Sequence, residues 1–182
     1  LNATSASADQ TYEAVSRLGN EVAGRLAARL RAETQGEVLF SPADRGRYAT
    51  DASIYQAMPV GVFLPRDAAD VRLALDICRD LKVPIVPRGG GTSQCGQTVG
   101  AGLVIDHSKH MRKILDVNVR QHTERVEPGL KMDQQNADLK KHGLWYPVDV
   151  TTSAQATLGG MAGNNSCGSR SIAYGNMVHN VL

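Results

Sequence analysis

Apolar residues recur at helical spacing in two stretches of the chain. The first stretch is residues 21–33, where every fourth position is apolar: Val22, Leu26 and Leu30. The second stretch shows the same helical periodicity at Val71, Ala74, Leu75, Cys78 and Leu81. Each pattern predicts a helix that packs one face against a core. Cys78 is therefore interpreted as a packing residue and not as a nucleophile.

Short apolar strands are expected on both sides of the second helix. Residues 60–64 and residues 83–86 are apolar runs bounded by turn-forming residues. Asp67 is expected to cap the helix N-terminus, and Asp70 lies in the first turn, where negative charge favours the helix dipole. Together these segments predict a β-α-β unit of about thirty residues.

The pattern changes after this unit, because strands become short and turns dense. Residues 102–106 form another apolar run, and residues 111–117 and 121–127 alternate as the two strands of a hairpin. A polar helix is expected over residues 130–142. These elements predict a second layer, mixed or antiparallel, beside the β-α-β unit.

Residues 38–58 show neither the periodicity of a helix nor that of a strand. They are interpreted as an irregular arm that crosses the domain. Its polar residues Arg45, Arg47 and Tyr55 could be cofactor contacts, but we interpret them as solvated. Residues 178–182 have the pattern of a strand that would normally continue.

Composition describes an ordinary globular protein, with 42% hydrophobic and 21% charged residues. The net charge of +2 and the scattered basic residues exclude a nucleic-acid-binding field. The odd number of cysteines, Cys78, Cys95 and Cys167, indicates reduced thiols in a cytosol-like compartment. No apolar run approaches the length of a transmembrane segment.

The glycine-rich stretch at residues 87–96 follows the strand at residues 83–86 and carries the chemistry. Three consecutive glycines leave the backbone bare, and successive bare N–H groups form an anion-binding nest. Neighbouring side chains add a cation and polar groups. The residues predicted to hold the anion here are Arg88, Gly89, Gly90, Gly91, Thr92, Ser93 and Gln94.

Three other interpretations compete for this stretch. A glycine run can be a plain mobile loop. The P-loop pattern nearly fits, but Gln97 stands where the phosphate-binding lysine must be. The dinucleotide fingerprint fails because Gln94 occupies its last glycine position and no helical pattern follows. An NTPase and a Rossmann site are therefore excluded.

A second glycine-rich stretch lies far downstream, at residues 156–170. The words PRGGGTS, P-x-D and ATLGGMAGNNSCGSRS occur in this order from about residue 60 to the end of the chain. They resemble the FAD-binding domain of the vanillyl-alcohol-oxidase/p-cresol-methylhydroxylase flavoproteins. The similarity is greatest to FAD-linked D-lactate, glycolate and D-2-hydroxyglutarate dehydrogenases. The NNSCGSRS motif resembles that of the family branch whose members carry an added iron–sulfur module.

The resemblance implies a second set of cofactor-binding residues. Small residues would admit the diphosphate of FAD, amides would donate to it, and a helical turn near Gly159 would point its N-terminus at the anion. A side chain at Gly90 or Gly160 is expected to block that approach. The implied residues are Pro147, Asp149, Thr152, Thr157, Gly159, Gly160, Asn164, Asn165 and Gly168.

The expected fold class is α+β (mixed α/β), of the FAD-binding type-2, or PCMH-type, fold. A β-α-β subdomain would pack beside a mixed or antiparallel second sheet, truncated at its C-terminus. We expect a disordered or loosely ordered segment at residues 1–20, a helix and arm at 21–58, and the FAD-binding domain at 59–182.

The resemblance further implies oxidation of a D-2-hydroxy acid with FAD. Attachment of FAD is expected to be non-covalent, because Thr92 stands where some relatives carry a linking histidine. An iron–sulfur cluster would lie elsewhere in the polypeptide. The electron acceptor would be a quinone, a cytochrome or an iron–sulfur module. An alcohol oxidase, a sugar-nucleotide reductase of the same fold and a non-catalytic nucleotide-binding module stay open as alternatives.

No catalytic residue is assigned within this chain. The five histidines show no metal-ligand spacing, so no metal site is expected and each is interpreted as a surface or hydrogen-bonded residue. The substrate clamp and base are expected in a separate part of the protein. The location is expected to be cytoplasmic, with peripheral attachment at the inner membrane as an option for the full-length protein.

Overall fold

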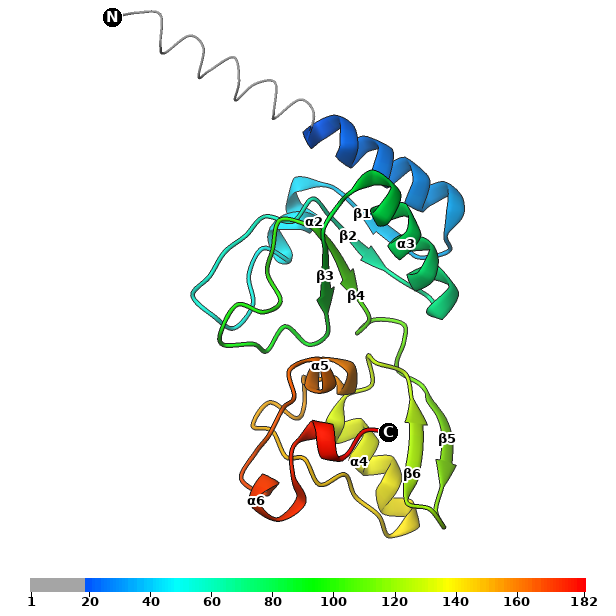
Figure 1. The fold of residues 1–182 in the computed structure, drawn as a ribbon, viewed down its shortest axis with the longest axis vertical. Coiled ribbons are helices and arrows are strands. Elements are labelled where there is room, and N and C mark those ends of the chain that lie inside the picture. The colour runs from blue at the N-terminus through cyan, green and yellow to red at the C-terminus, as the bar shows by residue number, and fades with distance from the viewer. Residues whose placement is uncertain (1–18) are drawn as a thin grey trace, which may run out of the picture.

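The computed structural model describes residues 19–182, which fold into two lobes (Figure 1). The first lobe is built on a four-stranded sheet and the second on a two-stranded sheet with short helices. This arrangement confirms the expected mixed α/β class with a second, antiparallel layer. The disorder expected for residues 1–20 falls outside the described residues except at residues 19 and 20. Those two residues are helical, and the division of the chain at residue 20 stays a prediction.

The first lobe contains a helix over residues 19–33 and then alternates strands and helices. Its elements are β1 (Glu37–Leu39), α2 (Pro42–Arg47), β2 (Gly61–Leu64), α3 (Ala68–Leu81), β3 (Ile85–Arg88) and β4 (Leu103–Asp106). The sheet order is β1-β2-β4-β3, with β2, β4 and β3 parallel and β1 antiparallel at the edge. The strands of the expected β-α-β unit are thus not neighbours, because β4 pairs between them.

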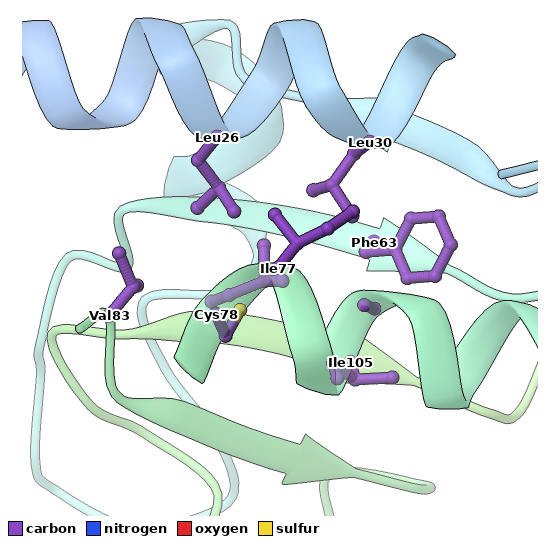
Figure 2. Packing of buried hydrophobic residues seen from close by; sticks show 9 residues of the cluster. Leu26, Leu30, Phe63, Ile77, Cys78, Val83 and Ile105 are labelled. Atoms are coloured by element: carbon purple, nitrogen blue, oxygen red, sulfur yellow. The ribbon is translucent and has the colours of Figure 1, made fainter. Parts of the chain in front are cut away.

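The main core lies between this sheet and the two long helices (Figure 2). Leu26 and Leu30 of the first helix pack with Ile77 and Cys78 of α3 and with Phe63 of β2, and all five are buried. Fully burying such a side chain contributes roughly 1.5–3 kcal/mol. Both predicted helices and the packing role of Cys78 are therefore confirmed.

Helix α3 begins and ends as the sequence indicates. The Asp67 carboxylate accepts hydrogen bonds from the backbone N–H groups of Ala69 (2.8 Å) and Asp70 (3.0 Å). Lys82 adopts the left-handed conformation that closes the helix. Asp70 is buried and accepts from the backbone N–H groups of Gln35 and Arg66, so it ties both flanking segments to α3.

The arm over residues 38–58 is more regular than expected. It contributes β1 and α2, and an isolated bridge joins Thr50 to Gln56. The hydrophobic pattern of this segment in the sequence is weak, because β1 is short and lies at the edge of the sheet. Arg45 is not solvated as expected: it is partly buried, and its Nε donates to the backbone oxygen of Pro59 at 2.6 Å.

The second lobe follows the predicted hairpin and polar helix. Its elements are β5 (Ile114–Asn118), β6 (Thr123–Val126), α4 (Met132–Leu139), η1 (Lys140–His142), α5 (Leu158–Gly163), α6 (Ser171–Tyr174) and η2 (Met177–His179). Leu130, Val148 and Met161 are buried in its own core. The strand expected at residues 178–182 is wrong, because η2 occupies its start and no strand follows.

Candidate functional site

The two glycine-rich stretches meet at the junction of the lobes, where α5 lies below the ends of β3 and β4 (Figure 1). A Cβ on Gly89 would stand 2.0 Å from the hydroxyl oxygen of Thr157. A Cβ on Gly90 would stand 2.2 Å from the backbone oxygen of Gln155. Segments far apart in sequence are thus in direct contact, and neither contact tolerates a larger residue. We call residues 88–98 the glycine loop.

Helix α5 is short and unusually rich in glycine. Thr157 caps it, with its side chain accepting from the backbone N–H of Gly160 at 3.3 Å. Gly159 is required by packing, since a Cβ would stand 2.5 Å from Cβ of Pro128. Gly160 and Gly163 are not: a Cβ would meet only the capping oxygen of Thr157 (3.1 Å) or nothing within 4 Å. Glycine inside a helix costs roughly 1 kcal/mol against alanine, and packing among the described residues does not account for it at these two positions.

The end of α5 also contacts the glycine loop. Gln97 Nε2 donates to Asn164 Oδ1 at 3.5 Å, and both side chains are exposed. Asn165 has a positive φ of 47°, and its Oδ1 accepts from the backbone N–H of Val178 at 3.0 Å. Asn164 Nδ2 also donates to Ser166 Oγ at 3.2 Å, so Asn164 lies beside the loop with both ends of its amide hydrogen-bonded, whereas Asn165 ties α5 to the C-terminal segment.

The Arg88 side chain lies across the glycine loop, where a Cβ on Gly91 would stand 2.6 Å from its Nη2, and its predicted contact with an anion stays a prediction. Its guanidinium lies over the ring of Tyr48, 5.2 Å from the centroid. Its Nη1 donates to the backbone oxygens of Tyr48 (3.5 Å) and Thr98 (3.4 Å). Arg88 thus connects the start of the glycine loop to its end and to the arm.

The remaining predicted residues of the loop differ in what holds them. The Ser93 hydroxyl donates to Gln97 Oε1 and accepts from the backbone N–H groups of Cys95 and Gln97, so it shapes the loop from within. Gly91 has a positive φ of 66°, which suits glycine. Thr92 and Gln94 make no side-chain hydrogen bond within residues 19–182, which leaves their polar groups available.

The segments that contain Asp149 and Gly168 lie in direct contact with each other. Asp149 accepts from the backbone N–H of Arg170 (2.9 Å) and from the hydroxyl of Ser169 (2.7 Å). These hydrogen bonds, Ser169 first, hold the pKa of Asp149 below its ordinary value. A Cβ on Gly168 would stand 1.6 Å from the backbone oxygen of Asp149. Both residues therefore have packing roles, and their cofactor contacts stay a prediction.

Pro147 and Thr152 lie on the segment that leads into the second glycine-rich stretch, and both are half-buried. The backbone oxygen of Thr152 accepts from the N–H groups of Gln155 (2.8 Å) and Ala156 (2.7 Å). This turn directs Gln155 toward Gly90. Trp145, two residues before Pro147, is 45% exposed, with the Arg170 guanidinium 5.1 Å from its ring centroid. Tyr146 packs against the second core.

A cavity of about 530 Å³ adjoins the glycine loop at the carboxyl ends of the parallel strands, which is where α/β sheets bind ligands. Arg88, Gly89 and Gly90 line one side, and Lys131 and Gln155 of the second lobe line the other. Its remaining lining comes from the first lobe and includes charges of both signs: Glu37, Leu39, Arg47, Tyr48, Leu64, Asp106, Ser108 and Lys109.

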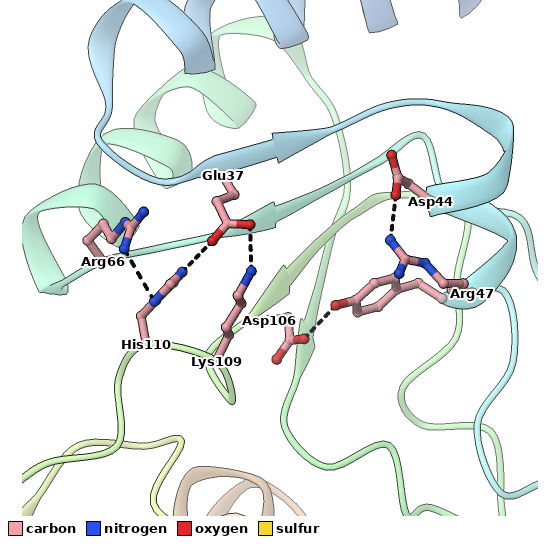
Figure 3. A network of polar contacts seen from close by, with 8 residues as sticks. Glu37, Asp44, Arg47, Arg66, Asp106, Lys109 and His110 are labelled. Atoms are coloured by element: carbon pink, nitrogen blue, oxygen red, sulfur yellow. Dashed lines mark hydrogen bonds and ion pairs between the residues drawn. The ribbon is translucent and has the colours of Figure 1, made fainter.

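The polar groups at this edge are mostly paired (Figure 3). Glu37 accepts from Lys109 and His110, each at 2.7 Å, and these bonds lower the pKa of its carboxyl, with Lys109 the larger cause. The Tyr48 hydroxyl donates to Asp106 at 2.8 Å. Burial first, and then this bond, raise the pKa of Tyr48 well above its ordinary value. Tyr48 and Lys131 were missed from sequence because no local pattern places them beside the glycine loop.

Neither metal-binding nor membrane-spanning features occur within residues 19–182. Among the described residues, no group of three or more histidine, cysteine, aspartate or glutamate side chains is placed to hold a metal ion. No helix in this range has the length and apolar character needed to span a bilayer.

Comparison with known proteins gives consistent matches. A family model described as an FAD binding domain matches residues 59–182. The chain is 41% identical over 150 residues to D-2-hydroxyglutarate dehydrogenase of Pantoea ananatis (strain AJ13355), covering 81% of this chain and 15% of that protein. It is 37% identical over 148 residues to glycolate oxidase subunit GlcD of Bacillus subtilis (strain 168), covering 79% and 31% respectively. The chain thus spans less than a third of the length of these relatives.

Solved structures show the same fold at lower identity. Alkyldihydroxyacetonephosphate synthase superposes with a TM-score of 0.76 at 22% identity, over 84% of this chain and 31% of that one. p-Cresol methylhydroxylase with substrate bound superposes with a TM-score of 0.61 at 20% identity, over 81% and 29%. The expected PCMH-type fold is therefore confirmed.

Proposed function

This chain belongs to the FAD binding domain family, and from that premise we propose that it holds FAD at the junction of its two lobes. The diphosphate would lie between the glycine loop and α5. The carrying observation is the pair of helix glycines, Gly160 and Gly163, which packing within the chain does not require. They stand beside a loop whose bare N–H groups favour an anion.

The residues proposed to meet FAD are those whose polar groups the chain leaves available. Backbone donors of the glycine loop would bind the diphosphate without adding bulk, at roughly 1.5–3 kcal/mol for each bond to a charged group. Thr92 and Gln94 would add side-chain donors, and Asn164 would add the second hydrogen of its amide, because the first is donated to Ser166. Pro147, Asp149 and Thr152 would shape the wall along the flavin. The boundary between the N-terminal helix and arm, which end at residue 58, and the FAD-binding domain, which begins at residue 59, is part of the same proposal.

FAD is proposed to be bound non-covalently, since Thr92 offers no linking imidazole. Cys95 and Cys167 are exposed thiols, and a thioether at either is the alternative that the test must exclude. Denaturation of the purified protein should release free FAD into the supernatant. Flavin that stays with the precipitated protein would contradict non-covalent binding.

The reaction proposed for the whole protein is oxidation of a D-2-hydroxy acid such as D-lactate, glycolate or D-2-hydroxyglutarate. When bound, FAD supplies the two-electron acceptor for this chemistry. This chain's residues would hold and orient it and shield it from water. Because the chain spans 15% of the length of its dehydrogenase relatives, we propose that the substrate clamp and the base lie in the remainder of a longer polypeptide. A quinone, a cytochrome or an iron–sulfur module would accept the electrons, and the location would be cytoplasmic or peripheral to the inner membrane.

The proposal is tested on the full-length protein by visible spectroscopy. The purified protein should show a flavin spectrum, and D-lactate, glycolate or D-2-hydroxyglutarate should bleach it anaerobically. Absence of flavin after incubation with FAD would contradict the binding site. Bleaching by simple alcohols but by none of these acids would instead support an alcohol oxidase of the same fold.

A further inference from the structure

The arm lies along the glycine loop, and the two project together from the same side of the first lobe (Figure 1). Near the start of the loop, the backbone N–H of Ala52 donates to the backbone oxygen of Gly91 at 3.2 Å. At its far end, the Thr98 hydroxyl donates to Asp51 Oδ2 at 3.0 Å. Two consecutive arm residues thus hold both ends of the loop.

Two further contacts join the same segments. Arg88, at the root of the loop, donates to the backbone oxygen of Tyr48 and lies over its ring. The ring of Tyr55 packs against Gly96, where a Cβ would stand 2.8 Å from Cδ2 of Tyr55. The arm therefore contacts the glycine loop at its root, near its start, in its second half and at its end.

Asp51 is the acceptor at the centre of these contacts. Its Oδ1 accepts from the backbone N–H of Ser53 at 2.8 Å while its Oδ2 accepts from Thr98. Burial raises the pKa of this carboxyl, but the hydrogen bonds from Ser53 and Thr98 outweigh burial and the pKa is lowered overall. The charged form therefore predominates at neutral pH, and hydrogen bonds to a carboxylate are the stronger kind.

A carboxylate beside a loop that receives an anion is unfavourable on charge alone. Its place is explained if its role is to fix the loop through Thr98 and not to touch the ligand. A glycine-rich loop that is already ordered loses less conformational entropy when it binds, and this preorganisation increases affinity.

Resting on the proposed function, we propose that Asp51 is a positioning residue. Through Thr98 it holds the glycine loop in the shape that receives the diphosphate of FAD. The arm thus forms a third wall of the site, together with the glycine loop and α5. The two roles open to Asp51 predict opposite effects of its removal. A repelling charge, once removed, would tighten FAD binding, whereas loss of a positioning residue weakens it.

The test is a double-mutant cycle in the full-length protein, with the FAD dissociation constant and the free energy of unfolding of the flavin-free form both measured. Thr98→Val, which keeps the shape but removes the hydroxyl, and Asp51→Ala should each raise the dissociation constant about tenfold. The double variant should be no weaker than either single one, because the two residues share one interaction. Thr98→Ser keeps the donor and is the matched control, expected within about twofold of wild type.

A readout that a purely structural role would not change is the pH dependence of FAD affinity. Wild-type affinity should fall as the pH drops through the lowered pKa of Asp51, and Thr98→Val should lose that dependence. The inference is overturned, and the proposed function left standing, if the wild-type protein takes up FAD and both Asp51→Ala and Thr98→Val bind FAD with wild-type affinity. Tighter FAD binding by Asp51→Ala than by wild type has the same consequence. Failure of the wild-type protein itself to take up FAD overturns both.

Discussion

Gly89 and Thr157 belong to different lobes, yet a single added carbon on Gly89 would stand 2.0 Å from the Thr157 hydroxyl oxygen. Thr157 is buried and caps α5, so the contact joins the end of β3 directly to the start of that helix. The position of α5 against the glycine loop is therefore set by backbone packing and not by long side chains.

Gly90→Ala should destabilise the protein even without flavin. Its Cβ would stand 2.2 Å from the backbone oxygen of Gln155, which cannot rotate away as a side chain can. Overpacking of this kind costs roughly 1–3 kcal/mol, measurable as a lower free energy of unfolding in urea. Gly24→Ala in the first helix is the matched control, since no described residue lies within 4 Å of its Cβ. It should raise stability by about 0.5–1 kcal/mol. Equal behaviour of the two variants would contradict the packing at the lobe junction.

Tyr48→Phe should destabilise the first lobe by about 1–3 kcal/mol, because it removes a donor from a buried carboxylate. Asp106 is 6% exposed and would keep only the backbone N–H of Ser108. Urea unfolding gives the measurement, and Tyr55→Phe is the control because the side chain of Tyr55 is exposed. A change of less than about 0.5 kcal/mol in Tyr48→Phe would show that its hydroxyl is not needed there.

Thiol modification should distinguish the three cysteines. Cys95 and Cys167 are exposed, whereas Cys78 is buried in the core and burial raises the pKa of its thiol to about 11. Reactivity follows the thiolate fraction and access. Two thiols should therefore react with an aromatic disulfide in the native protein, and the third only after denaturation. Rapid reaction of all three under native conditions would contradict the packing of α3.

Glu124 should make stability depend on pH in a direction opposite to that of the paired carboxylates. Burial raises its pKa above the ordinary 4.5, a nearby Asp138 adds to the rise, and Gln135 and His142 oppose it. Gln135 Nε2 donates to Glu124 Oε2 at 2.8 Å, while Oε1 of each residue is buried with no hydrogen-bond partner among residues 19–182. A proton on Glu124 would satisfy such an oxygen, so the protonated form suits the folded state.

The sign follows from linkage. A carboxyl whose folded pKa is raised contributes stability that is complete below 4.5 and is lost as the pH rises through the raised value. Glu124→Gln removes this loss, since the new amide can donate to Gln135 Oε1, and should gain about 1 kcal/mol at pH 7. The difference in unfolding free energy between variant and wild type should vanish near pH 4. A pH-independent difference would contradict the assignment.

The helices and hairpin could be predicted from sequence because each is encoded locally. Leu26 and Leu30 fix a buried stripe by spacing, and Asp67 fixes a cap by its own side chain. The insertion of β4 between β2 and β3 could not be predicted, since apolar strands such as Leu103–Asp106 do not encode their neighbours. The same holds for the site. Glycine runs show where the backbone must lack side chains, but not whether a ligand or another segment of the chain makes the close contact there. Gly90 was expected to make room for a ligand, and packing against Gln155 already accounts for it.

The arm shows the other limit of sequence reasoning. Asp51 and Thr98 carry no recognisable spacing, and only the folded chain brings them to 3.0 Å. Arg88 is predicted to bind the anion because it opens the glycine run, and the sequence gives no sign that its guanidinium also contacts the ring and backbone of Tyr48. Long-range pairing of this kind depends on the tertiary fold, which local patterns do not report.

The central claim is that the glycine loop and α5 receive the diphosphate of FAD, and Gly160 tests it most directly. A Cβ on Gly160 would stand 3.1 Å from the Thr157 hydroxyl oxygen, a tight contact that a small shift of that side chain relieves, so Gly160→Val should keep the free energy of unfolding within about 1 kcal/mol of wild type. Titration of flavin-free wild-type and variant protein with FAD, followed by flavin fluorescence, compares their affinities. The account predicts that wild-type protein binds FAD and that Gly160→Val binds it at least about tenfold more weakly. Equal FAD affinity in the folded variant would contradict it.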